Sequence, residues 1–228
     1  MKKLTTLLVA ILFTGGMAIA QSNNATVDQT GDDHEVTISQ VGTLNSSNID
    51  QTADAGRFGD DVAEATITQE GASNEVNLSQ RAFYGDAEAS ITQLGDGNRV
   101  EGTAQGEDFR QNHGLNIIDV FMQGNDNVLS GSQSEAQKNV NSLYVDMLGN
   151  SNTMNTFQHY GYADVILDGD NNIVDLSQRS NHPSTSQTAY IDVFGSDNSA
   201  SVMQTGQSHT ANVNVTGNSN TSSITQGN

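Results

Sequence analysis

A five-residue segment recurs along almost the whole chain, and this repeat constrains the fold more than any other feature. Its first three copies, residues 25–29, 36–40 and 47–51, end in glutamines eleven residues apart. The middle residue of a copy is aliphatic apart from Gly102, Gly131 and Thr156, and its two neighbours are mostly Thr, Ser, Asp or Asn. This alternation predicts half-buried β-strands whose first, third and fifth residues point inward. The other fourteen copies are 65–69, 76–80, 89–93, 100–104, 118–122, 129–133, 143–147, 154–158, 163–167, 174–178, 189–193, 200–204, 211–215 and 222–226.

The connections between the segments are of two kinds. Every even-numbered segment is followed by Gly-x-x-Asn, and Gly and Asn tolerate the positive φ of a tight turn. Odd-numbered segments run mostly into longer connections of variable length, at 52–64, 81–88, 105–116 and 179–187. Gly31/His34 and Gly206/His209 repeat the turn pattern after two odd segments. The predicted turn pairs are Gly42/Asn45, Gly71/Asn74, Gly95/Asn98, Gly124/Asn127, Gly149/Asn152, Gly169/Asn172, Gly195/Asn198 and Gly217/Asn220.

These two kinds of connection predict an all-β solenoid with two short strands per rung and about eight rungs. Uniform turns then form one edge and variable loops the other, and almost no helix is expected outside the first residues. The odd column ends in Gln29, Gln51, Gln80, Ala104, Gln133, Gln158, Gln178, Gln204 and Gln226. The even column ends in Gln40, Gln69, Gln93, Met122, Met147, Leu167, Val193 and Val215. Stacked amides can hydrogen-bond from rung to rung, so we predict the glutamines as a buried core ladder.

The amino terminus has the pattern of a secretory signal peptide. Lys2 and Lys3 precede a short apolar stretch, and Ala18-Ile19-Ala20 forms a cleavage motif before Gln21. We therefore expect a signal peptide at 1–20 and a repeat domain at 21–228. Residues 21–228 keep all 27 acidic residues and six of the eight basic ones, for a net charge of −21. This charge argues against nucleic acid and anionic membranes as partners, and the absence of cysteine excludes disulfides.

Segments such as Ile67-Thr-Gln69-Glu-Gly71-Ala-Ser-Asn74-Glu-Val76-Asn-Leu78-Ser-Gln80 resemble the curlin repeat. The resemblance extends from about Ala25 to the last residues. It implies a curli-type extracellular functional amyloid of biofilm matrix, either major subunit or nucleator, with a periplasmic chaperone and an outer-membrane export pore as partners. Two features differ from the family pattern, since a Gly-rich leader before the first repeat is missing and the variable loops are long.

The sequence contains little that would support metal binding or catalysis. Asp-rich turns at 31–34, 95–98 and 169–172 suggest calcium, but the period is eleven rather than the nine of calcium β-rolls. His34, His113, His159, His182 and His209 lack metal-ligand spacing, and no catalytic motif occurs, so we expect no metal site, no cofactor and no enzyme activity. Phe121, Tyr144, Phe157 and Tyr190 fall at outward positions, where they are packing residues between the sides of fibres, simple surface residues or a platform for sugars or dyes.

The leading hypothesis from the sequence is a subunit that stacks end to end with its own copies, because no capping element is apparent at either end of the repeats. The alternatives are a monomeric adhesin that binds partners through its loops and a calcium-dependent β-roll.

Overall fold

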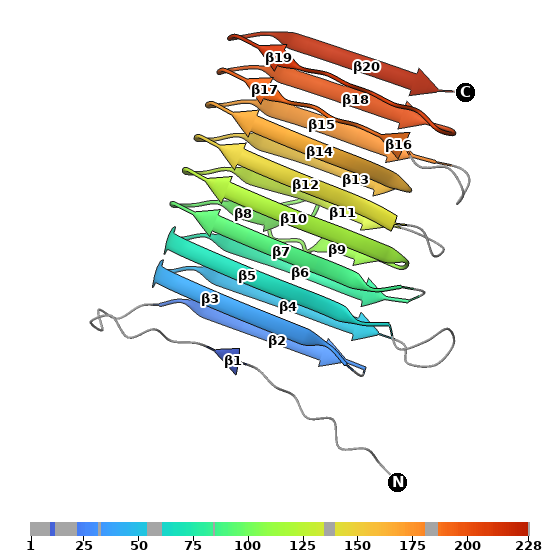
Figure 1. Ribbon diagram of the computed structural model, residues 1–228. Coiled ribbons are helices and arrows are strands. Elements are labelled where there is room, and N and C mark those ends of the chain that lie inside the picture. Colours follow the sequence, from blue (N-terminus) through green and yellow to red (C-terminus); the bar gives the residue numbers. More distant parts are fainter. Residues whose placement is uncertain are drawn as a thin grey trace.

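The computed structural model describes residues 10–11, 22–31, 33–53, 61–83, 85–134, 140–180 and 187–227. These residues form two parallel β-sheets that face each other and wind upward as one solenoid (Figure 1). No part of the chain that the structure describes is helical, and none of it has a helix able to cross a bilayer. The predicted all-β solenoid is thus confirmed.

Sheet A takes the even-numbered segments, and sheet B takes the odd-numbered ones. Pairing between segments is parallel and joins segments that are two apart in the chain. Sheet A consists of β1 (Ala10–Ile11), β3 (Glu35–Thr43), β5 (Ala63–Ala72), β7 (Ala87–Leu94), β10 (Leu115–Gln123), β12 (Val140–Leu148), β14 (Gly161–Asp168), β16 (Gln187–Thr188), β17 (Val193–Phe194) and β19 (Val215–Thr216). Sheet B consists of β2 (Asn24–Thr30), β4 (Ser46–Ala53), β6 (Glu75–Ala82), β8 (Arg99–Glu101), β9 (Phe109–Asn112), β11 (Val128–Ser134), β13 (Thr153–His159), β15 (Ile173–Arg179), β18 (Ser199–Thr205) and β20 (Thr221–Gly227).

The core lies between the two sheets and is thin. Its apolar residues come from the first and third positions of the segments, as with Ile67, Leu78 and Ile91, which are essentially inaccessible to solvent. In the upper part of sheet A the fifth position is apolar and buried as well, as with Met147. A single rung could not bury these side chains, so each rung depends on its neighbours.

The prediction for segment 100–104 is wrong after its second residue. Val100 pairs with its neighbours as expected, but residues 102–108 leave the sheet. β9 then completes the strand that β8 began, so these two short strands together fill one strand position, or level, of sheet B. Phe109 then lies opposite Leu78, and Gln111 takes the ladder position that was predicted for Ala104. Gly102 would place no side chain in the core, and Ala104 would place no amide in the ladder. The excursion brings β9 into their place, and β9 supplies both groups. The predicted loop 105–116 therefore contains β9 and the start of β10.

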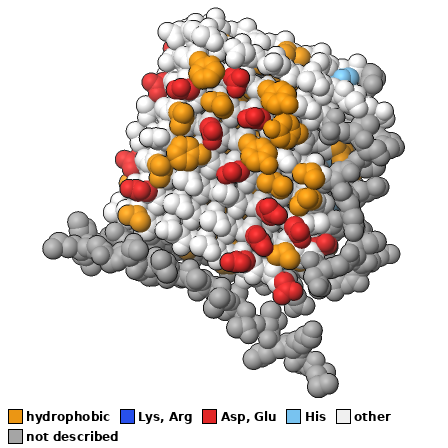
Figure 2. Space-filling model, in the orientation of Figure 1, with side chains coloured by type: hydrophobic (Ala, Val, Ile, Leu, Met, Phe, Trp, Pro, Cys, Tyr) orange, Lys and Arg blue, Asp and Glu red, His pale blue; other side chains and the backbone are white. Residues whose placement is uncertain are grey.

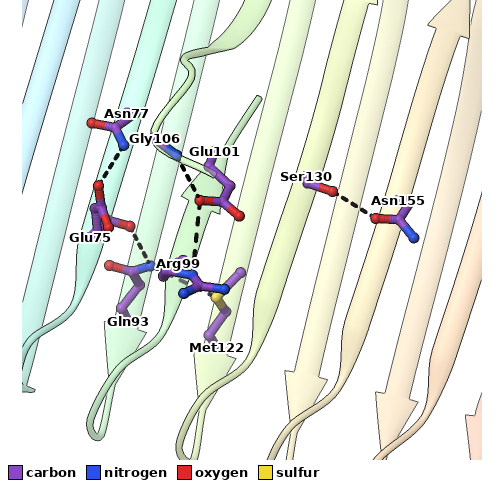
Figure 3. Close-up of polar contacts among 9 residues, drawn as sticks. All are labelled: Glu75, Asn77, Gln93, Arg99, Glu101, Gly106, Met122, Ser130 and Asn155. Atoms are coloured by element: carbon purple, nitrogen blue, oxygen red, sulfur yellow. Dashed lines mark hydrogen bonds and ion pairs between the residues drawn. The ribbon is translucent and has the colours of Figure 1, made fainter. Parts of the chain in front are cut away.

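The excursion is attached to the end of β8 by polar contacts (Figure 3). The buried carboxylate of Glu101 accepts a hydrogen bond from the Gly106 backbone N–H over 3.3 Å and forms an ion pair with Arg99 over 3.9 Å. Phe109 is the largest fully buried side chain, and Gly131 occupies the same core position on the next level. Gly131 has a φ angle of 145°, and a Cβ there would overlap the carbonyl oxygen of Thr156 on the following level, so this position requires glycine.

Segments 189–193 and 211–215 form strand only in part. Asp192 and Asn214 have φ angles of 45° and 37°, which interrupt the extended backbone before Val193 and Val215. The side chains of Ala189 and Ile191 nevertheless remain buried, as predicted for inward positions.

Candidate functional site

A chain of glutamine side chains runs through the core beside sheet B. Each Nε2 donates to the Oε1 of the glutamine on the next level, and the amides between the ends of the chain are fully buried. The successive donor–acceptor pairs are Gln29–Gln51 (2.8 Å), Gln51–Gln80 (2.8 Å), Gln80–Gln111 (2.9 Å), Gln111–Gln133 (3.3 Å), Gln133–Gln158 (3.0 Å), Gln158–Gln178 (3.0 Å), Gln178–Gln204 (2.9 Å) and Gln204–Gln226 (2.8 Å).

All of these bonds point the same way, from the amino-terminal end of the solenoid toward the carboxy-terminal end. The amides from Gln51 to Gln178 also donate to backbone carbonyls of the opposite sheet, as Gln80 does to the carbonyl of Glu64 over 2.9 Å. The ladder therefore ends in an unused acceptor, Gln29 Oε1, and in Gln226 Nε2, which donates only to the carbonyl of Thr210. Both statements concern bonds among the residues that the structure describes.

Sheet A has a shorter ladder of the same polarity. Gln40 donates to Gln69 over 2.8 Å, and Gln69 donates to Gln93 over 2.9 Å. Gln93 then meets the sulfur of Met122 at 3.9 Å, where the amide ladder stops. Above this point the same core position is apolar, in Met122, Met147, Leu167, Val193 and Val215.

The Gly-x-x-Asn turns form a second set of ladders along one edge. The Asn74 Nδ2 donates to the carbonyl of Gly95 on the next level over 2.7 Å, and its Oδ1 accepts the backbone N–H of Asn98 over 3.0 Å. The same contact between Oδ1 and the next backbone N–H joins every turn asparagine to its successor. The series runs through Asn45, Asn74, Asn98, Asn127, Asn152, Asn172, Asn198 and Asn220.

The structure corrects the reason for which these asparagines were predicted. They were expected in the turns because Asn tolerates positive φ, but the left-handed position is the residue before each asparagine, as at Ser73 before Asn74 with a φ angle of 59°. None of the eight turn asparagines has a positive φ, and all of them except Asn220 are buried. The residues at which this correction applies are Asn45, Asn74, Asn98, Asn127, Asn152, Asn172, Asn198 and Asn220, which are preceded by Leu44, Ser73, Gly97, Asp126, Ser151, Asn171, Asp197 and Ser219.

Burial makes these asparagines part of the interior rather than of an exposed turn. Asn127, for example, donates through Nδ2 to the carbonyl of Gly149 over 2.8 Å, and Asn152 donates in the same way to the carbonyl of Gly169 over 2.7 Å. Asn172 and Asn198 repeat the bond, at 2.7 Å each, to the carbonyls of Gly195 and Gly217. The amide is needed because it satisfies backbone groups that the turn would otherwise leave buried without a partner.

The turn glycines do have the predicted left-handed conformation. Gly71 has a φ angle of 119°, and a Cβ there would overlap the carbonyl oxygen of Gly95. The turns therefore require glycine on both conformational and steric grounds. The remaining predicted turn glycines, at 42, 95, 124, 149, 169, 195 and 217, also have positive φ.

His34 and His209 occupy the asparagine position of their turns. Each contacts, through Nε2, the carbonyl four residues earlier, Thr30 and Thr205 respectively, at 3.0 Å. Asn45 contacts the carbonyl of Val41 in the same way. The two histidines thus replace the turn asparagine in this contact.

Two sets of polar residues were missed by the sequence analysis. Where the residue after the turn glycine is Asp, Asn or Ser, its side chain accepts a backbone N–H from the preceding level, as Asp96 does from Ala72 over 2.7 Å and Asn125 does from Asp96 over 2.9 Å. This contact gives the Asp-rich turns a structural role. On the opposite edge, buried Asn141 donates to Asn116 over 3.3 Å. The Gly-Asp and Gly-Asn pairs of the turns could have indicated the first set, but the second position before segments 118–122 and 143–147 follows no repeat pattern.

No metal-binding cluster is present in the described ranges, where no three His, Asp or Glu side chains are placed to hold an ion. The outward aromatic residues lie on both outer faces. Tyr144 and Tyr190 are exposed on sheet A, and Phe157 on sheet B lies beneath Arg179, whose guanidinium carbon is 4.5 Å from the ring centroid. His182 lies outside the described residues.

Comparison with known proteins agrees with the repeat structure. A family model described as the curlin associated repeat matches residues 20–52 and 195–227. The first stretch contains β2, β3 and all of β4 except Ala53, and the second contains β18 to β20. The levels between them continue the glutamine ladder of sheet B and the asparagine ladder of the turns. No curated protein and no solved structure matches the chain.

Proposed function

Because the chain carries the curlin associated repeat near both ends of its solenoid, we propose that it is a secreted structural subunit that assembles end to end into extracellular curli-like amyloid fibres. Biofilm matrix and surface adhesion are the roles that this repeat family suggests. By the same resemblance, a nucleator or major subunit, a periplasmic chaperone and an outer-membrane export pore are its proposed partners. We further propose that residues 1–20 are removed as a signal peptide during export.

The observation that carries this proposal is the one-way amide ladder. One end of the solenoid presents glutamine acceptors, at Gln29 and Gln40, and the other end presents a glutamine donor, at Gln226. Such ends are complementary to each other and not to themselves, so they favour head-to-tail addition. Val27 and Ile224, in the end strands, are only partly buried, whereas the corresponding side chains of inner strands are fully buried. A second copy would complete the burial of these side chains and would pair the open strand edges.

The number of strand levels in each sheet limits how copies of a chain made of residues 21–228 can stack on one another. From β2 to β20, sheet B has nine levels and sheet A has eight, since β8 and β9 share a level and so do β16 and β17. A copy added by translation alone would leave one strand position of sheet A empty at every joint. A copy added with a half turn about the solenoid axis would place β3 on β20 and β2 on β19, and would leave no position empty.

The equivalence of the two sheets favours the half turn. Gln69 of sheet A donates to the carbonyl of Ser46 in sheet B over 3.2 Å, and Gln80 of sheet B donates to the carbonyl of Glu64 in sheet A over 2.9 Å. The two bonds join corresponding positions, so a half turn superposes one sheet on the other and keeps the strands parallel. At such a joint Gln226 would donate to Gln40 of the next copy.

Engineered cysteines can test both the assembly and the joint, because the chain has no cysteine of its own. Ser223, Thr37 and Thr26 are exposed at the same outward position of β20, β3 and β2. Neighbouring strands at about 4.8 Å bring such residues within disulfide range. Ser223→Cys with Thr37→Cys should cross-link consecutive copies after a half turn, whereas Ser223→Cys with Thr26→Cys should cross-link them after a translation.

The chain of residues 21–228 should form thioflavin-positive fibres with the cross-β spacing, with and without a calcium chelator. Oxidised fibres of the Ser223→Cys/Thr37→Cys variant should give a ladder of covalent multimers on a denaturing gel. A ladder only with the Thr26→Cys partner would refute the half turn and leave the assembly intact. A chain that stays monomeric under all growth conditions would refute the assembly itself.

A further inference from the structure

The outer face of sheet A alternates apolar and acidic side chains over four levels. In one column, pairing places Asp119 beside Tyr144 and Tyr144 beside Asp164. In the next column, Phe121 lies beside Asp146. The two columns are out of phase, so apolar and acidic side chains are interleaved across the face. Figure 2 shows this mixture of orange and red on the upper part of the face.

Three tyrosines form the apolar centre of this face. The ring centroids of Tyr144 and Tyr162 are 6.1 Å apart, and those of Tyr162 and Tyr190 are 6.0 Å apart. Tyr144 and Tyr190 are 38% and 41% exposed, so part of each side chain is available to a ligand. They occupy the same column two levels apart, which corresponds to about 9.6 Å along the solenoid axis.

The face carries negative charge, and the described cations lie elsewhere. The four arginines that the structure describes, Arg81, Arg99, Arg110 and Arg179, all belong to strands of sheet B. No Lys or Arg side chain is visible on the face of sheet A in Figure 2. Burial raises the pKa of Asp146, and the nearby carboxylates of Asp119 and Asp164 raise it further. The carboxylates thus repel one another, and a cationic partner would relieve that repulsion.

We propose that the outer face of sheet A, from β10 to β17, binds a β-linked amino-sugar polymer that carries free ammonium groups. The apolar faces of its pyranose rings would stack on the tyrosines, and its ammonium groups would pair with the interleaved aspartates. A pyranose ring in an extended β-linked chain advances by nearly the distance between two strands, so alternate rings would meet Tyr144 and Tyr190. A second copy of this chain fits the face less well, because two such faces would bring carboxylates against carboxylates. This binding function is additional to fibre assembly and does not require it.

The proposal is tested by titrating a glucosamine hexasaccharide against the immobilised chain, at a pH where the amines of the sugar are protonated. The Tyr144→Ser/Tyr162→Ser/Tyr190→Ser variant should bind about tenfold more weakly, because ring stacking is lost. The Asp146→Asn/Asp164→Asn variant should also bind several-fold more weakly, and its affinity should depend less on salt. A matched control on the opposite face, Phe157→Ser/Met203→Ser, should bind like the wild type.

Two further ligands separate specific binding from general attraction to a chain of high negative charge. Hexalysine should bind the wild type and the tyrosine variant equally, because its attraction is only electrostatic. The neutral glucose hexasaccharide, β-linked in the same way, should bind more weakly than the glucosamine chain. The proposal is overturned if the tyrosine variant keeps the wild-type affinity for glucosamine hexasaccharide, or if the neutral chain binds as tightly. It is also overturned if the tyrosine variant abolishes lateral bundling of fibres at neutral pH, since the face would then be a contact between copies.

Discussion

Replacement of Gln133 by leucine tests the glutamine ladder at a position far from both ends. Gln133 is fully buried, accepts a hydrogen bond from Gln111 over 3.3 Å and donates to Gln158 over 3.0 Å. It also donates to the carbonyl of Ile117 over 3.1 Å. Leucine has a similar volume but can make none of these bonds, so the substitution removes hydrogen bonding with little change in packing.

The expected cost follows from the groups that would lose a partner. Gln158 Oε1 would remain buried without the donor that it has now, at a cost of about 1–3 kcal/mol. Gln111 Nε2 would keep its bonds to the carbonyls of Glu88 and Asn116, so it would lose less. The greater apolar surface of leucine offsets part of the loss. We expect a net destabilisation of about 2 kcal/mol.

Guanidinium unfolding of the assembled chain at fixed protein concentration, followed by far-UV circular dichroism, measures this loss. With an m-value of about 5 kcal/mol/M, the midpoint should fall by about 0.4 M. Met147→Leu is the matched control, because Met147 is equally buried but lies in the apolar part of the sheet A column, and it should cost less than about 1.5 kcal/mol. Equal midpoints for the two variants would refute the claim that buried amide contacts hold the levels together.

Three other predictions concern the turns, the surface charge and pH. Gly71→Ala should destabilise the fold by more than about 2 kcal/mol in the same unfolding assay, because Gly71 has a positive φ and a Cβ there would overlap the carbonyl of Gly95. Gly106→Ala should cost about 1 kcal/mol, because Gly106 has a positive φ but open space around it. Raising the salt concentration to about 0.3 M should shorten the lag of thioflavin-monitored growth, since screening weakens repulsion between chains of net charge −21, and an unchanged lag would contradict end-to-end addition as the limiting step. The pKa of Asp146 is raised in the folded chain, so the contribution of Asp146 to stability should increase as the pH falls through the folded pKa toward 3.8. Asp146→Asn should flatten that part of the curve of unfolding free energy against pH. Parallel curves for the variant and the wild type would contradict the raised pKa.

The sequence by itself determined the repeat, the inward positions and the division of strands between two sheets. Period-two alternation fixes which side chains face the core, and the difference between uniform turns and variable connections fixes which strands stack. The inward position of a residue such as Gln80 could therefore be predicted without coordinates, because every level repeats the same local pattern.

Only the tertiary structure decided where one level departs from the pattern and which outer face carries which chemistry. The spacing of the repeat places a segment at Val100 to Ala104, yet the ladder continues through Gln111. The chain leaves the sheet after β8 and returns at β9, and this excursion fills the core and keeps the column of buried amides unbroken. The burial of turn asparagines such as Asn127 likewise depends on the level above, whose carbonyl the amide reaches. Contacts such as Tyr162 against Tyr144 and Tyr190 join residues that are close only across stacked levels. A one-dimensional repeat specifies the inside of each rung, but neighbours across rungs are set by the lengths of the intervening loops, which follow no pattern in the sequence.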